Sequence, residues 1–415
     1  MSFKSNPRRE GDLTLPRRDW VVLPFLSIVT IISVMGSAEL LGWQLFRWSG
    51  EHELEHRCIV RNDPSTGIRG VPNTECWDKT AESPSISYKF NSCGHRAGMD
   101  CTPKAPGTYR IVLIGSSFAM GMRAPEEQTI GHLLPAQLTR ETGRKIELYN
   151  EGFGWGSPHT VDLQFAGVLA AEPDLILWLL TSYDIQNPTM LFPSDFQQNK
   201  LITNSTHASS ERRNFVANIW DTWNKVRARF AGKSAPDAFR DLWNQTRTSI
   251  MLRHFLYKSQ SRYISAFLAN DRESGYLKAR FDPAWEDHLR QFDGVAAEVE
   301  SRARKAGVPL VASLVPFGQH AAIVSKGEWP AGYDPYKLDD EVRRIIVSHG
   351  SSYVDILPNF RTVPNPERHY YPVDGHPNAD GYAMITAFLA KALTDGTMPQ
   401  LKAAHGPETA LSDGN

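Results

Sequence analysis

Residues 108–121 read TYRIVLIGSSFAMG, and this stretch decides the fold class. It opens with a short apolar run rich in β-branched side chains, which is typical of a buried parallel strand. A Gly-Ser-Ser turn follows, and a helical pattern begins directly after it. A strand that passes into a helix in this way indicates the start of a βαβ unit.

The same alternation of strand and helix continues through the rest of the chain. We expect helices over 126–143, 159–173, 283–306, 338–348 and from Pro377 to Leu393, and strands over 145–152, 174–184, 308–317 and 352–358. Gly143 is the expected stop of the first helix. Together these elements predict a three-layer α/β/α sandwich with a central parallel sheet over residues 106–395. Residues 396–415 are expected to form a polar tail.

Residues 188–280 interrupt this rhythm with aromatic and arginine-rich stretches, and we interpret them as a helical insertion. Amphipathic helices are expected over 214–230 and 249–268. Trp220, Trp223 and Phe230 suit a sugar-stacking or membrane-facing surface, although such spacing more often marks the buried face of a helix. The insertion is expected to act either as a lid or as a partner-docking surface.

The N-terminus carries the signature of a membrane segment. A basic cluster within residues 1–19 precedes the uncharged run WVVLPFLSIVTIISVMGSA, residues 20–38. At 1.5 Å per helical residue this run spans about 28 Å, enough to cross the hydrocarbon core. Residues 20–43 therefore predict a signal anchor with residues 1–19 in the cytoplasm. The alternative is a signal peptide cleaved after Gly36-Ser37-Ala38. Both readings place the rest of the chain outside the cytoplasm, in a periplasmic setting.

All four cysteines lie in a loop-rich neck, residues 44–105. In an oxidising compartment we expect two disulfides, most simply Cys58 with Cys76 and Cys93 with Cys101. A zinc site is the weaker alternative, because the short C-x-x-C pairs are missing and only His95 adds a ligand.

The overall composition excludes some classes of function. With 41% hydrophobic and 22% charged residues the chain is globular, and its formal net charge of −1 gives no electrostatic footprint for nucleic acid.

Three short segments carry candidate chemistry, each at the carboxyl end of a predicted strand or just before a helix. Ser117 lies in the strand-to-helix turn, where its hydroxyl is exposed for attack on a carbonyl group. Residues 149–158, YNEGFGWGSP, offer glycine N–H groups to a ligand. In residues 370–382, YYPVDGHPNADGY, Asp374 and His376 stand two apart, so that the carboxylate can orient the imidazole.

On these residues the chain resembles the SGNH/GDSL hydrolase superfamily, especially its membrane-anchored extracytoplasmic members that act on acylated sugars or polysaccharides. The resemblance covers about residues 88–395 apart from the insertion. It implies a flavodoxin-like fold, Ser117 as nucleophile, His376 as base and Asp374 as its orienting partner. Ser116 stands where the family usually has Asp. Asp374 lies two residues before His376, as in relatives that acetylate polysaccharides.

The resemblance also implies an oxyanion hole. Its expected donors are the N–H groups of Ser117 and Gly154, with Gly152 or Gly156 as alternatives. The family's third block usually reads Gly-x-Asn-Asp, whereas this chain reads Thr181-Ser182-Tyr183-Asp184, so Tyr183 replaces the Asn. The Tyr183 phenol can donate a hydrogen bond to the oxyanion although it is longer than the Asn side chain, and Asn187 or Thr181 are the expected substitutes. Loss of one oxyanion donor typically costs about 2.7–4 kcal/mol in the transition state.

The resemblance implies a serine hydrolase that cleaves ester bonds of an acylated carbohydrate or a small ester, without metal or organic cofactor. A polysaccharide O-acyltransferase with the same triad, working with polysaccharide-assembly proteins, is one alternative. A catalytically inactive glycan-binding or assembly protein is the other. A phosphate-binding protein is disfavoured because no Walker-type lysine follows Gly115.

Overall fold

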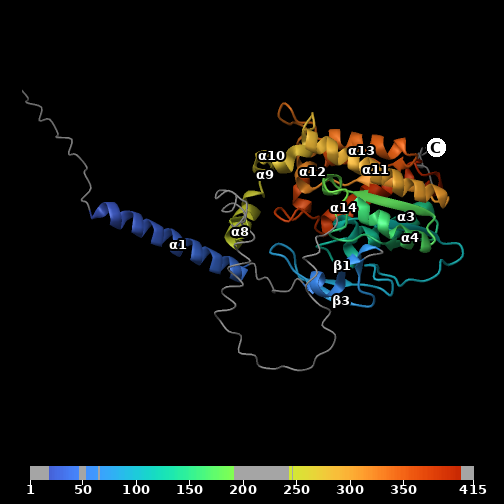
Figure 1. Cartoon of the computed structure of the whole chain (residues 1–415), viewed down its shortest axis with the longest axis horizontal. Coiled ribbons are helices and arrows are strands. Elements are labelled where there is room, and N and C mark those ends of the chain that lie inside the picture. The colour runs from blue at the N-terminus through green and yellow to red at the C-terminus, as the bar shows by residue number, and fades with distance from the viewer. Residues whose placement is uncertain (1–17, 46–52, 64–65, 191–242, 245, 403–415) are drawn as a thin grey trace, which may run out of the picture.

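The computed structural model describes residues 18–45, 53–63, 66–190, 243–244 and 246–402 (Figure 1). The basic cluster before residue 18, the helix expected over 214–230 with Trp220, Trp223 and Phe230, and most of the polar tail lie outside the described residues.

The centre of the main domain is a parallel sheet of five strands in the order β6-β5-β7-β8-β9. Numbered along the chain this is 2-1-3-4-5, the flavodoxin-like doubly wound order. The predicted fold class is confirmed. The strands are β5 (Tyr109–Gly115), β6 (Ile146–Asn150), β7 (Leu175–Leu180), β8 (Leu310–Leu314) and β9 (Ser352–Tyr353).

Helices cover both faces of this sheet, and as a result every residue of β5, β7 and β8 is buried. On one face, Val112, Ile176 and Trp178 pack with residues of α4 (Pro158–Ala170), α11 (Pro283–Lys305) and α13 (Lys337–Ser348). On the other, Leu113 and Leu177 pack with α3 (Ile130–Thr142), α12 (Gly318–Lys326) and α14 (Ala379–Thr394). Gly143 ends α3 in the left-handed conformation, as expected.

Several expected boundaries are wrong. The strand expected over 174–184 ends at Leu180, because Thr181 and Asp184 cap a short helix, α5 (Ser182–Gln186). The strand expected over 352–358 is only two residues long, because the Asp355 carboxylate accepts the Leu357 N–H at 3.0 Å and starts a 3₁₀ turn, η5 (Leu357–Thr362). The tail begins later than expected, because η7 (Pro399–Leu401) buries Leu401 in the core. The helix expected over 249–268 is divided into α8 (Arg247–Leu256) and α9 (Gln260–Leu268), followed by α10 (Asp271–Ser274).

The neck is more ordered than its composition indicates. It forms two antiparallel hairpins, β1 (Ile59–Asp63) with β2 (Gly67–Gly70) and β3 (Glu75–Asp78) with β4 (Ile86–Lys89), after a π-helical turn, η1 (Leu54–Cys58). The strands have at most five residues, so sequence periodicity does not reveal them. The hairpins pack on the main domain through Met120, Met122 and Phe153.

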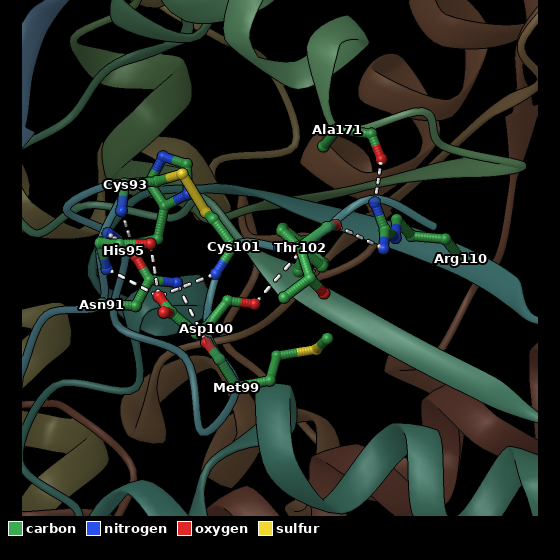
Figure 2. The surroundings of a disulfide bond; sticks show 11 residues. Asn91, Cys93, His95, Met99, Asp100, Cys101, Thr102, Arg110 and Ala171 are labelled. Atoms are coloured by element: carbon green, nitrogen blue, oxygen red, sulfur yellow. Dashed lines mark hydrogen bonds between the residues drawn. A yellow bond between two sulfur atoms is a disulfide. The ribbon is translucent and has the colours of Figure 1, made fainter. Parts of the chain in front are cut away.

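Both disulfides have the expected pairing, Cys58 with Cys76 and Cys93 with Cys101. Figure 2 shows the second, where the Asp100 carboxylate accepts the N–H groups of Ser92 and Cys101, each at 2.9 Å. Arg110 of β5 reaches this region and donates to the carbonyls of Thr102 and Ala171 at 3.0 and 2.7 Å (Figure 2). The second disulfide loop is therefore joined to the sheet by a buried cation.

The N-terminal apolar helix α1 (Asp19–Leu45) stands away from the sheet (Figure 1). Its segment Val21–Gly42 is long and apolar enough to cross a membrane, and most of it is exposed on the surface of the protein. The helix coincides with the expected segment 20–43.

Replacing Cys58 and Cys76 by Ala tests the contribution of the first disulfide. The bridge closes a sequence separation of 18 residues, so its loss is expected to lower the free energy of unfolding by about 3 kcal/mol through loop entropy. Chemical denaturation under non-reducing conditions measures this. Replacing Cys93 and Cys101, separated by 8 residues, is the matched comparison, with an expected loss of about 2.5 kcal/mol. Unchanged stability in both variants would contradict the role given to the bridges.

Candidate active site

Ser117 lies at the end of the central strand β5, as the first residue of the short helix α2 (Ser117–Met120). The preceding Gly115 has φ +142°, and a Cβ there would lie 2.3 Å from the Leu179 carbonyl oxygen, so the turn requires glycine. Ser117 is half-buried, and its hydroxyl has no hydrogen-bond partner among the described residues. The turn presents a hydroxyl that the fold itself does not use.

His376 and Asp374 form a hydrogen-bonded pair on the loop before α14. His376 Nδ1 lies 2.6 Å from Asp374 Oδ1, and the same oxygen accepts the His376 N–H at 3.3 Å. Because Nδ1 is held by the carboxylate, Nε2 is the ring nitrogen left for a reaction. Nε2 is buried and has no hydrogen-bond partner among the described residues. The pair has the arrangement of a base with its orienting acid.

Two contacts join this loop to the Ser117 turn. The rings of Phe118 and His376 are 5.4 Å apart, and Arg123 Nε donates to Asp374 Oδ2 at 3.2 Å. The Ser117 hydroxyl and His376 Nε2 make no hydrogen bond with each other in this structure. Catalytic hydrogen bonds are often long without substrate and tighten in the complex. The structure thus brings the three predicted residues into one region, without a closed Ser–His contact.

Arg123 is a site residue that the sequence reasoning missed. Its guanidinium forms ion pairs with Asp374 and with Asp78 of the neck, and its side chain is 14% exposed. Burial opposes the charge, but the two carboxylates outweigh it and hold the pKa of Arg123 above its ordinary value. Burial likewise acts to raise the pKa of Asp374, yet His376 and Arg123 hold it well below its usual range. Asp374 is therefore ionised at neutral pH.

The neck supplies further partners to the same region. Glu82 Oε2 accepts the backbone N–H groups of Val373 and Asp374 at 3.0 and 2.8 Å. Tyr88 Oη accepts the Arg123 N–H at 3.0 Å. Buried Arg96 donates to the carbonyl of Ala124 at 2.7 Å and to that of Met120 at 3.2 Å. These groups fix both the segment after Ser117 and the loop before His376.

The expected glycine donors of the second block are already engaged. Gly154 N–H donates to the Met120 sulfur at 3.0 Å, Gly152 N–H to Asn150 Oδ1 at 3.0 Å, and Gly156 N–H to the Phe153 carbonyl at 3.0 Å. Thioether sulfur is a weak acceptor. Of the three glycines, Gly154 therefore gives up the weakest hydrogen bond if its N–H donates to an oxyanion instead. Asn150 also donates to the Ala119 carbonyl at 2.9 Å, which ties this loop to α2.

Ser116 and Thr181 share a different partner. The buried Asp184 accepts the Ser116 hydroxyl at 3.1 Å and the Thr181 hydroxyl at 2.7 Å. Burial outweighs these bonds and raises the pKa of Asp184 to about 6. Because the Thr181 hydroxyl is held by Asp184, it is not available as an oxyanion donor in this arrangement.

Tyr183 and Asn187 belong to the short helix α5 (Ser182–Gln186) and the residue that follows it. The Tyr183 side chain is 39% exposed and its hydroxyl points to the Met190 sulfur at 3.7 Å. The Asn187 amide donates to the Tyr183 carbonyl at 3.0 Å. Neither side chain hydrogen-bonds to Ser117 or His376 within the described part of the chain. Their predicted role stays a prediction.

A cavity of about 560 Å³ lies beside the second block, between the neck and α4. Glu151, Phe153 and His95 line it together with the Cys93–Cys101 bridge. Burial raises the pKa of Glu151 to about 8 and lowers that of His95 to about 4, so both groups are largely uncharged at neutral pH. A cavity of about 430 Å³ lies between α11 and α13. Ser117 lines neither cavity.

Within the described ranges, no group of three or more His, Cys, Asp or Glu residues is arranged to hold an ion. His95 lies beside a disulfide, whose sulfurs are not thiolate ligands.

No protein-family model matches the chain, and no curated protein matches it in sequence. Solved structures match at low identity. The structure of TesA is 10% identical, with 69% of this chain and 98% of that chain covered, at a TM-score of 0.34. A lipase/acylhydrolase from Enterococcus faecalis is 10% identical, with 72% of this chain and 100% of that chain covered, at a TM-score of 0.32. A proposed SGNH hydrolase from Slackia heliotrinireducens is 11% identical, with 69% of this chain and 99% of that chain covered, at a TM-score of 0.30. Likenesses of this size assign neither an activity nor a substrate to this chain.

Replacing Arg123 by Met tests the charge bridge. The variant leaves Asp78 and Asp374 without their shared cation, and loss of one partner from a buried ion pair costs about 3–5 kcal/mol. Thermal and denaturant unfolding measure the loss. The double variant Arg123→Met with Asp78→Asn is the control and should recover part of it, because one uncompensated carboxylate is removed. A loss below about 1 kcal/mol, as for an exposed pair, would contradict the bridge.

Replacing Glu151 by Gln tests the buried carboxyl. In the folded protein the pKa of Glu151 is raised to about 8. In the unfolded chain Glu151 has its ordinary, lower pKa, so it loses its proton at a lower pH than in the folded protein. The free energy of unfolding of the wild type therefore falls as pH rises from the unfolded to the folded pKa of Glu151. The variant lacks this penalty. Its advantage over the wild type should grow from pH 5 to 8, by at most about 1.4 kcal/mol per unit, and level off above pH 8. A difference in Tm that does not change with pH would show that Glu151 titrates normally.

Proposed function

We propose that this protein is a serine hydrolase that cleaves ester bonds, with O-acyl groups of a carbohydrate or polysaccharide as its substrates. The observation that carries the proposal is the His376–Asp374 pair at 2.6 Å, whose loop meets the helix of Ser117 through the contact of Phe118 with His376. Among the described residues, neither His376 Nε2 nor the Ser117 hydroxyl has a hydrogen-bond partner.

The reaction proceeds in two steps. His376 Nε2 takes the proton of the Ser117 hydroxyl while Ser117 Oγ attacks the ester carbonyl. The alcohol part of the ester then leaves and takes that proton from His376. Asp374 remains ionised and holds the imidazole in the tautomer that has a free Nε2. The Ser117 N–H, at the start of α2 where helix N–H groups lack intrahelical partners, stabilises the oxyanion together with Gly154. Water then releases the acyl group.

A polysaccharide O-acyltransferase uses the same acyl-enzyme, with a sugar hydroxyl in place of water as the second acceptor. The resemblance to polysaccharide-acetylating relatives in the spacing of Asp374 and His376 supports this alternative. Partner proteins of polysaccharide assembly belong to it.

A catalytically inactive glycan-binding protein is favoured by a different observation. The Ser117 hydroxyl and His376 Nε2 do not hydrogen-bond, and the N–H groups of Gly152, Gly154 and Gly156 all have partners. The assay below separates this reading from the other two.

We place the protein at a membrane, with its main domain outside the cytoplasm. The apolar helix α1 and the two disulfides support this location. Glu39 follows directly after the candidate cleavage position Ala38 and hydrogen-bonds to α8. This contact supports an uncleaved anchor over a signal peptide, with the N-terminus in the cytoplasm.

Product analysis with an isotopically labelled acetyl ester, with and without an oligosaccharide acceptor, tests the function. We expect labelled acetate from the wild-type full-length chain in detergent, or labelled sugar for a transferase. Ser117→Ala should abolish either product, and Asp374→Asn should slow it by about 10²–10⁴-fold, as expected when a general base loses its alignment. Turnover that survives in Ser117→Ala would contradict the nucleophile. A folded wild type that forms neither product would favour the binding protein.

A further inference from the structure

Helix α8 presents an apolar stripe that the described part of the fold leaves exposed. Leu252, Phe255 and Leu256 lie at positions i, i+3 and i+4, so they share one face of the helix. Their side chains are 49%, 57% and 37% exposed. Three adjacent large apolar side chains on one short helix indicate a surface that meets something other than water.

The amino end of α8 is joined to the apolar helix α1, beside which it lies in Figure 1. The Glu39 carboxylate of α1 accepts the N–H groups of Arg247 and Thr248, each at 3.0 Å, and the Thr248 hydroxyl at 2.9 Å. Gly42 allows the close approach, because a Cβ there would lie 3.0 Å from Arg247 Cβ. A carboxylate at the N-terminus of a helix satisfies its unpaired N–H groups and complements its dipole.

This junction fixes the depth of α8 relative to a bilayer. The span Val21–Gly42 ends at the residue that contacts Arg247, so α8 begins where the hydrocarbon core ends. At 1.5 Å per residue, Leu252 lies within about 8 Å of Arg247 along the helix axis. The headgroup layer is about 5–8 Å thick on each side. Leu252 therefore lies within or at the edge of that layer when α8 runs outward, and Phe255 and Leu256 reach it as well when α8 runs along the membrane surface.

The charge around the stripe fits a membrane surface. Residues 247–262 contain Arg247, Arg253, Lys258 and Arg262 and no Asp or Glu. The Lys258 ammonium lies 4.8 Å from the centre of the Phe255 ring, so a basic group borders the apolar face. Short helices with one apolar face and a basic border are typical of the bilayer interface.

We propose that α8 is an interfacial helix that inserts Leu252, Phe255 and Leu256 into the outer face of the same bilayer that α1 spans. This inference rests on the proposed function in one respect, that α1 remains as an anchor, and it does not depend on catalysis. The occupant of the stripe is lipid, since the anchor brings the bilayer to the first turn of α8.

This contact also sets the position of the candidate active site. On α8, His254 Nδ1 lies 2.7 Å from Glu82 Oε1, while Glu82 Oε2 accepts the N–H groups of Val373 and Asp374. Two side chains therefore separate the interfacial helix from the loop that carries Asp374. The proposed reaction takes place close to the membrane surface, where an acyl donor or a growing glycan attached to lipid would be presented.

Site-directed spin labelling of the full-length chain in lipid nanodiscs tests the proposal. Leu252→Cys and Phe255→Cys each receive one nitroxide, because the four native cysteines are paired in disulfides. Val29→Cys in α1 is the lipid reference, and Val347→Cys on α13, an apolar residue that is 53% exposed, is the water reference. Relaxation by oxygen relative to a water-soluble nickel complex is expected to be several-fold higher at Leu252 and Phe255 than at Val347.

Each result has one reading. Lipid-like values at Val29 with water-like values at Leu252 and Phe255 would overturn the proposal while leaving the anchor intact. Water-like values at Val29 would overturn the anchor and the proposal together. Protection of Leu252 from both relaxants, with dipolar broadening between copies, would show that the stripe meets a second copy of the chain and not lipid.

Discussion

The guanidinium of Arg123, held between Asp78 of the neck and Asp374 beside His376, is the interaction on which the candidate site depends. It lies where three separate segments meet: the neck, the chain just after Ser117, and the loop before α14. One buried cation is shared by two carboxylates there, so removal of Arg123 leaves both carboxylates without that counter-charge. The neck is therefore a structural part of the site. Asp78 comes from it and holds the Arg123 side chain, while Glu82, Tyr88 and Arg96, also from the neck, hold the backbone on both sides of the proposed Ser–His pair.

Much of the fold could be predicted from sequence because its signals are local. The buried strand β7 is a continuous apolar run, and β5 is one apart from Arg110. The Gly143 stop and the helices after Pro283 follow ordinary helix rules. The neck hairpins escaped prediction because strands of four or five residues carry little periodicity. The two-residue β9 escaped it because one side chain, Asp355, starts a turn inside an otherwise strand-like segment.

The residues of the candidate site also fall into those that local sequence motifs reveal and those that depend on contacts between distant segments. Ser117, Asp374 and His376 could be found because each lies in a short motif, and the structure places the acid and the base in hydrogen-bond contact. Arg123, Glu82 and Asp78 could not, because their role depends on contacts between residues far apart in the sequence. The predicted oxyanion donors are the least supported. Gly154 N–H is occupied by a sulfur atom, and the Tyr183 hydroxyl points toward Met190.

The central claim is that His376 activates Ser117. The most direct measurement is the intact mass of the full-length chain after treatment with a fluorophosphonate, which reacts with activated serine hydroxyls, in the wild type and in Ser117→Ala and His376→Ala. The account predicts one adduct on the wild type, mapped to Ser117, and none on either variant. Folded wild-type protein that stays unmodified, or an adduct that persists in Ser117→Ala, would contradict it.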